Sequence, residues 1–140
     1  MIRDSADVLG VSGTGSFTGV SGSFSVNQLN VGSNQPVSLV VYKDTTTATT
    51  QFAIFSISTS NEGAFKVMIT AKRGSDRQVS EITATHDGTT AVATEYSMIM
   101  TNGILANYDV DVNGGLFRLL ATPTSASSTT FVSNVTFIEA

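Results

Sequence analysis

Apolar and polar side chains alternate along much of this chain. The alternation is clear over residues 65–72 and 104–112. A period of two places successive side chains on opposite faces of a β-strand, so these segments predict strands with one buried side and one solvent-facing side. Residues 51–57 are more continuously apolar, which predicts a strand buried on both faces. Residues 37–42 form another apolar strand directly after Pro36.

Turn signals separate the predicted strands. The strongest is Asp87-Gly88, which lies between segments with strand character. As a two-residue hairpin turn it would place His86 opposite Thr89 and Ile82 opposite Ala93. Asn-Gly and Gly-Gly pairs mark two further turns, after residues 101 and 113.

The spacing of these strands predicts the fold class. Turns follow one another about every 8 to 12 residues, and no segment shows the 3.6-residue apolar period of a helix. The chain is therefore expected to be all-β, an antiparallel β-sandwich with roughly eight or nine strands, and this number of strands resembles a jelly roll. We expect one sandwich domain over residues 16–140.

Residues 1–15 are expected to form an extended N-terminal arm. Gly10-Val11-Ser12-Gly13 recurs as Gly-Val-Ser-Gly at 19–22, and two copies are too few for a repeat architecture. The arm is either a flexible Gly/Ser segment or a segment that docks on a neighbouring subunit.

The positions of the apolar residues within the alternating strands also predict which side chains form the core. The following side chains are expected to be buried: Phe55, Ile69, Ile82, Tyr108, Val110 and Phe117.

The composition limits the classes of partner that the protein is expected to bind. Only 13% of the residues are charged, and the net charge is −4. Soluble monomers usually carry about a quarter charged residues, so a surface this poor in charge favours burial against neighbouring subunits. The seven Lys and Arg are scattered along the sequence, which argues against nucleic acid as a partner. No apolar run is long enough to span a membrane, and the N-terminus lacks the apolar segment of a signal peptide.

Candidate chemistry is sparse. The chain has no Cys, so disulfides and thiolate metal sites are excluded. His86 is the only histidine, and a catalytic histidine needs a partner with a defined role. We interpret His86 as a structural residue that hydrogen-bonds near the Asp87-Gly88 turn. No catalytic residue and no cofactor are predicted.

A weak calcium candidate lies at residues 109–114. Asp109, Asp111 and Asn113 alternate with valines before a Gly, as at the start of a calcium-binding loop. The twelfth position of such a loop should be a Glu, and here it is Leu120. A strand with Asp109 and Asp111 facing solvent explains the same alternation more simply.

Glu81 and Glu95 are the best candidates for a pair of catalytic carboxylates. In the two-residue hairpin register, Glu81 lies opposite Thr94 and Glu95 opposite Ser80, so the two carboxylates lie on opposite faces. Such a pair cannot flank one glycosidic bond. We therefore expect no enzymatic activity.

The second half of the chain has a recognisable pattern. Residues 85–90 read Thr-His-Asp-Gly-Thr-Thr, residues 94–96 read Thr-Glu-Tyr, and residues 114–123 read Gly-Gly-Leu-Phe-Arg-Leu-Leu-Ala-Thr-Pro. Over about residues 37–140 the chain resembles a β-rich domain of virion structural and tail-fibre proteins of tailed bacteriophages, especially marine and cyanobacterial ones. The resemblance implies a particle component without enzymatic activity.

These observations lead to two functional hypotheses. The first is a capsid decoration protein that forms a homo-oligomer, expected to be a trimer, and contacts other virion proteins such as the major capsid protein. The alternative is a tail-fibre or receptor-binding module that presents its loops to the host surface. In both, the protein belongs to a virion assembled in the host cytoplasm, with neither nucleic acid nor membrane as a partner.

Overall fold

The computed structural model describes residues 28–32, 34 and 36–140. The strands in this part of the chain are β1 (Gln28–Val31), β2 (Val37–Thr46), β3 (Phe52–Ser58), β4 (Glu62–Arg73), β5 (Asp76–His86), β6 (Ala91–Met100), β7 (Ala106–Asn113), β8 (Leu116–Pro123) and β9 (Thr129–Glu139). Over the same residues there is no helix, and so none that could cross a membrane. The predicted arm at 1–15 and the start of the predicted domain lie outside the described residues.

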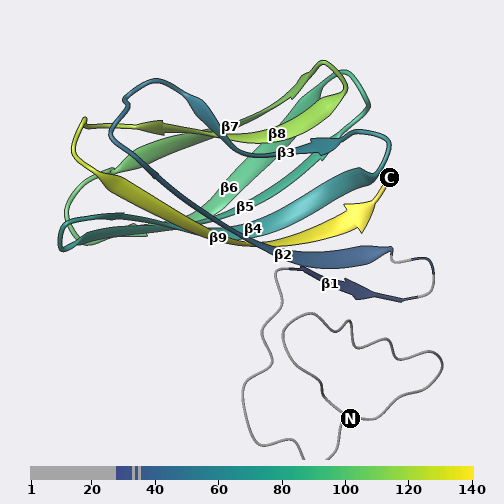
Figure 1. Ribbon diagram of the computed structural model, residues 1–140, viewed down its shortest axis with the longest axis horizontal. Helices are drawn as coiled ribbons and strands as arrows, with labels where there is room; N and C mark the ends of the chain where they lie inside the picture. Colours follow the sequence, from purple (N-terminus) through teal and green to yellow (C-terminus); the bar gives the residue numbers. More distant parts are fainter. Residues whose placement is uncertain (1–27, 33, 35) are drawn as a thin grey trace, which may run out of the picture.

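The strands form two antiparallel sheets in two layers. One sheet has the order β1-β2-β9-β4-β5-β6, and the other has the order β3-β8-β7. Figure 1 shows the three-stranded sheet lying over the six-stranded one. Buried side chains from both sheets form one hydrophobic cluster. The predicted all-β antiparallel sandwich is confirmed.

The strand order contains a Greek-key arrangement. The chain alternates between the sheets through β2, β3 and β4, and later β8 and β9 return beside β3 and β2. In the larger sheet β4, β5 and β6 follow one another as neighbours, and β9 returns over a long connection to lie beside β4, which is a Greek-key arrangement. The likeness to a jelly roll stays a prediction.

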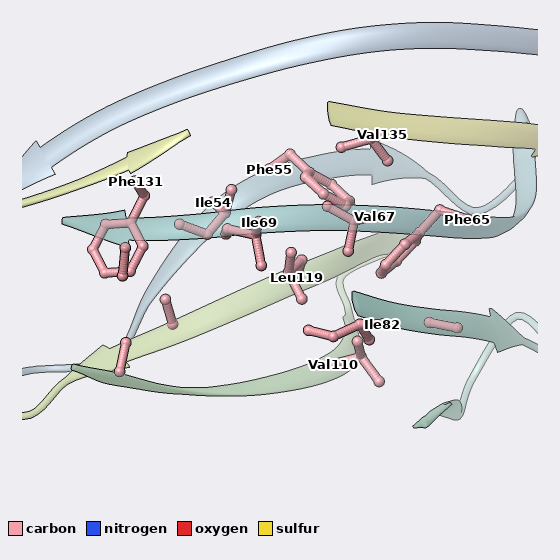
Figure 2. Packing of buried hydrophobic residues seen from close by; sticks show 14 of the residues in the cluster. Ile54, Phe55, Phe65, Val67, Ile69, Ile82, Val110, Leu119, Phe131 and Val135 are labelled. Carbon is pink, nitrogen blue, oxygen red and sulfur yellow. The ribbon is translucent and has the colours of Figure 1, made fainter. Parts of the chain in front are cut away.

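Phenylalanine rings join the two sheets at the centre of the core (Figure 2). The Phe65 ring of the larger sheet lies 5.0 Å from the rings of Phe55 and Phe117, both from the smaller sheet. Figure 2 shows Phe55 and Phe65 within this core. Five of the six expected core residues are buried, namely Phe55, Ile69, Ile82, Val110 and Phe117. Tyr108, the sixth, is partly buried and packs against the same cluster.

The predicted register of the hairpin between β5 and β6 is wrong. His86 pairs with Ala91 rather than with Thr89, because the connection is a four-residue loop closed by a hydrogen bond from Asp87 N to Thr90 O. The Asp87 carboxylate accepts hydrogen bonds from residues 89 and 90, which stabilises this longer loop. A further irregularity between Glu81 and Ile82 shifts the pairing again.

One strand at the edge of the larger sheet is poorly covered. Met98 and Met100 of β6 pair with Ser80 and Gln78, whose side chains are fully buried between the sheets. Paired residues of antiparallel strands point to the same face, so the two methionines also point inward. Both are nevertheless more than a third exposed, because β6 is an edge strand of its sheet.

Candidate interaction surface

The side of the six-stranded sheet that faces away from the three-stranded sheet is rich in exposed apolar side chains. We call this side the outer face. Each of its strands alternates buried inward positions with outward ones, as in β4, where Phe65 and Val67 are buried and Met68 is 51% exposed. The large apolar side chains on the outer face are Leu29, Val31, Leu39, Val41, Met68, Val92, Tyr96, Ile99, Val132 and Ile138.

Strand pairing places the apolar side chains of the outer face in rows across the sheet. Val41 pairs with Asn134, and Asn134 pairs with Met68, so these residues form one row over β2, β9 and β4. A second row joins Leu29 and Leu39 on β1 and β2. The rows place apolar side chains close together at the β1, β2, β9 and β4 side of the sheet, with the polar Asn134 and Thr136 of β9 between them. We call this side the apolar part of the outer face.

The outer face is as large as a protein–protein interface. Six strands spaced about 4.8 Å apart and about ten residues long cover roughly 800 Å². A stable interface buries about 800 Å² on each partner. Monomeric proteins seldom expose an apolar patch larger than a few hundred Å². The dimensions and composition of this face fit contact with another protein surface.

His86 has the structural contacts expected of it. Gly88 N donates a hydrogen bond to His86 Nδ1 at 2.9 Å, which leaves Nε2 as the protonated nitrogen that donates to Glu62 O at 2.6 Å. The imidazole ring lies 4.7 Å from the Phe117 ring. Both nitrogens are therefore engaged by the backbone, and they hold the end of β5 against the start of β4.

The calcium candidates lie along a strand rather than around an ion. Asp109 and Asp111 are alternate residues of β7, and Asn113 ends it before the turn into β8. Asp111 forms an ion pair with Arg118, the residue directly across on β8, which lowers the pKa of the Asp111 carboxyl. Asp109 Oδ1 accepts a hydrogen bond from Val110 N. The residues that the structure describes contain no group of three or more His, Asp or Glu placed to hold a metal ion.

The two candidate carboxylates, Glu81 and Glu95, lie on opposite faces of the sheet. Glu95 pairs with the buried Ile82 and so points inward, whereas Glu81 precedes Ile82 and points outward. The sequence-based placement on opposite faces is thus confirmed, although the pairing partners differ from those expected.

Glu95 instead shares a recess with Tyr108. This recess of about 270 Å³ lies where β6 and β7 form the open edges of the two sheets. The Tyr108 hydroxyl is buried without a hydrogen-bond partner. Burial, and then the charge of Glu95, raise the pKa of Tyr108 above its usual value. Asp109 supplies a second carboxylate to the lining, and the remaining lining residues are apolar.

Comparisons with known proteins identify partial structural likeness only. Neither the scan of protein-family models nor the search of curated proteins finds a match. Among solved structures, the tailspike protein of Acinetobacter baumannii phage AM24 is similar over 75% of this chain, with 9% identity and a TM-score of 0.44. The tailspike protein of Acinetobacter phage vB_ApiP_P1 is similar over 98% of the chain, with 15% identity and a TM-score of 0.42.

The chain corresponds to 26% of the length of each tailspike protein. TM-scores below 0.5 do not establish a shared fold, so the functions of these two proteins do not carry over to the chain. The marine or cyanobacterial part of the resemblance stays a prediction.

The outer face is the feature that sequence reasoning missed. The alternation within 65–72 places Met68 on the solvent side, and a Met among outward positions was the available signal. This signal can be interpreted only when the strand pairing is known, because the pairing places Met68 in the same row as the exposed Val41.

Proposed function

We propose that this chain is a non-enzymatic structural module of a tailed-phage particle, and that it assembles with further copies of itself through the apolar part of the outer face. The observation that carries the proposal is the row formed by Val41, Asn134 and Met68, which lies within a large, uncovered and mostly uncharged sheet face. The sequence resemblance supports a place in the phage particle, and the uncovered sheet face supports assembly with further copies of the chain.

A second copy is the occupant that the surface fits best. The apolar part belongs to an outer face whose whole area is roughly that of one side of a standard interface, and apolar side chains and hydroxyls make up most of that face. The same patch on two copies can pair about a twofold axis, because one surface then supplies both sides of the contact. The expected trimer would instead need two different patches on each copy.

The assembly proposal is tested by one charged substitution on each side of the molecule. The wild-type protein should elute as an oligomer in size-exclusion chromatography with light scattering at about 10 µM, a concentration at which specific interfaces of this area hold. Val41→Asp, which adds a charge at the centre of the interface, should give a folded monomer with an unchanged far-UV spectrum.

Leu116→Asp is the matched control. Leu116 is 41% exposed and lies on β8 of the other sheet, so this variant should remain an oligomer. A wild-type protein that is monomeric at the same concentration would contradict the proposal, as would loss of the oligomer in both variants.

The location in the particle is tested separately. Immunogold labelling of purified particles should mark the tail if the chain is a tail module and the head if it is a capsid decoration protein. Absence of the chain from purified particles would exclude both locations.

A further inference from the structure

Three of the Lys and Arg residues that are scattered along the sequence lie close together on the outer face. Lys43 of β2, Lys72 of β4 and Arg77 of β5 come from three different strands. All three line one broad hollow of about 720 Å³ that borders the apolar part of the outer face, because Lys43 lies two residues after Val41 on β2. We call it the basic hollow.

Strand pairing fixes the arrangement of the basic hollow. Thr45, Thr130, Lys72 and Arg77 are successive partners across β2, β9, β4 and β5. The hydroxyls of Thr45 and Thr130 lie 2.9 Å apart, within hydrogen-bond distance. Lys43 lies two residues before Thr45 and therefore on the same face. The result is three cations beside hydroxyl groups on one rigid sheet.

No carboxylate neutralises these cations within the described part of the chain. The one ion pair found there joins Arg118 to Asp111 on the other sheet. The lining of the basic hollow contains no Asp or Glu. Arg77 Nη1 donates to the backbone oxygens of Gly74 and Asp76 instead, which leaves the charge of the guanidinium uncompensated. A positive hollow thus stands out on a protein whose net charge is −4.

Lys72 and Arg77 are direct cross-strand partners. Like charges placed directly opposite each other on a sheet repel and destabilise the pair. An anion bound between the two side chains would remove this repulsion, so the arrangement favours the binding of an anion there. Salt screens such exposed charges within about 10 Å at 0.1 M, which makes the effect dependent on ionic strength.

We propose that the basic hollow binds an oxyanion group, namely a phosphate or a sulfate. Arg77 presents a guanidinium that matches tetrahedral oxyanions, Lys43 and Lys72 supply charge, and the hydrogen-bonded hydroxyls of Thr45 and Thr130 together supply one free donor. The group is either free in solution or carried on a sugar. Single-stranded nucleic acid is disfavoured because the lining has no aromatic ring on which bases could stack.

The test is an amide-resolved NMR titration of the full-length protein at constant ionic strength. Inorganic phosphate and glucose 6-sulfate should each give saturable shifts confined to residues 43–45, 70–77 and 128–132, and chloride should give none. Tighter binding of the sulfated sugar would identify a sugar-borne group, and tighter binding of phosphate would identify the free ion. Stronger binding of an oligonucleotide than of both would overturn the proposal in favour of a nucleic-acid site.

Paired variants make the result specific to the basic hollow. Lys72→Gln and Arg77→Gln should each weaken anion binding about tenfold, since each removes a charged contact. Lys66→Gln is the matched control, because Lys66 lies on the same face of β4 but outside the hollow, over the Tyr96 ring. An equal loss in Lys66→Gln, or shifts spread over the whole outer face, would overturn the proposal.

A stability readout separates a bound ion from a general salt effect. Lys72→Gln removes the cross-strand repulsion and should raise the melting temperature without ligand, while it abolishes most of the rise that phosphate causes in the wild type. If phosphate raises the melting temperature equally in both proteins, the ion does not act at Lys72.

Discussion

One carboxylate sets the shape of the loop between β5 and β6. Asp87 Oδ1 accepts hydrogen bonds from the backbone N–H groups of Thr90 and Thr89, at 2.7 and 2.9 Å, and from the Thr89 hydroxyl at 2.8 Å. These donors favour the ionised carboxylate and lower the pKa of Asp87 to about 2. The loop is therefore held by a group that carries its charge at any pH near neutrality.

The Asp87 hydrogen bonds predict a specific pH dependence. Because the pKa is lowered on folding, their stabilisation is present above the ordinary pKa of 3.8 and is lost as the pH falls through about 2. In an NMR titration of the side-chain carboxyl carbon, Asp87 should show a midpoint near pH 2. Thr89→Ala, which removes the hydroxyl donor alone, should move the midpoint upward. A wild-type midpoint near 3.8 would contradict this account of the loop.

Local patterns predict individual turns only when the side chains there do not compete with the backbone. Gly114 and Gly115 both have positive φ angles, 58° and 76°, as the mirror-image turn expected of a Gly-Gly pair requires. The Asp87-Gly88 pair is an equally strong signal for a two-residue turn. However, the Asp87 carboxylate accepts hydrogen bonds from two backbone amides, and the loop has four residues instead of two. A dipeptide signal does not report such side-chain hydrogen bonds, so the register could not be predicted.

At the scale of elements, a buried glutamine ties β7 to the larger sheet. Gln78 of β5 is fully buried, and its Oε1 accepts hydrogen bonds from Leu105 N and Ala106 N at 2.7 and 3.1 Å. Its Nε2 donates to Ala106 O at 2.9 Å. Arg73 Nη2 donates to the oxygen of Leu105 as well. The start of β7 is thereby fixed at the point where the chain crosses between the sheets.

Removal of the Gln78 amide should destabilise the fold strongly. Gln78→Ala leaves three backbone groups buried without partners, and each such group costs about 1–3 kcal/mol. We expect a loss of roughly 3 kcal/mol or more in the free energy of unfolding, measured by urea denaturation. Gln51→Ala, at an exposed position outside the strands, serves as the control and should change stability by less than about 0.5 kcal/mol. Equal stability of the two variants would show that Gln78 does not hold this crossing.

The faces of the strands could be predicted, but not the surfaces that they build together. Alternation assigned the outward positions of β4 and β7, because each depends on its own sequence. Strand order depends on contacts between distant segments, such as the return of β9 between β2 and β4. This return places Val41 near Met68 and Thr45 near Lys72. The candidate interaction surface and the basic hollow therefore appear only with the fold.

At the scale of the whole molecule, aromatic rings make contacts between the two sheets of unequal width. Aromatic side chains make several of the contacts between the sheets: Phe55 and Phe117 contact Phe65, and Phe52 and Tyr108 contact Phe131. No disulfide can reinforce these contacts, because the chain contains no Cys. The attachment of the smaller sheet thus depends in part on the packing of these aromatic side chains.

Truncation of Phe117 should therefore unfold or nearly unfold the sandwich. Its side chain is fully buried against Phe65 and His86, and Phe→Ala in such a position costs about 3–5 kcal/mol. Domains are stable by only about 5–15 kcal/mol, so the urea midpoint should fall steeply or the native state should be lost. Leu116→Ala, at the exposed neighbouring position on β8, should keep most of the wild-type midpoint. If Phe117→Ala and Leu116→Ala unfold at the same urea concentration, the sheets are held together by contacts other than the aromatic cluster. If Phe117→Ala alone is destabilised, and its loss of structure is cooperative in both far-UV and near-UV spectra, the two sheets fold as one unit.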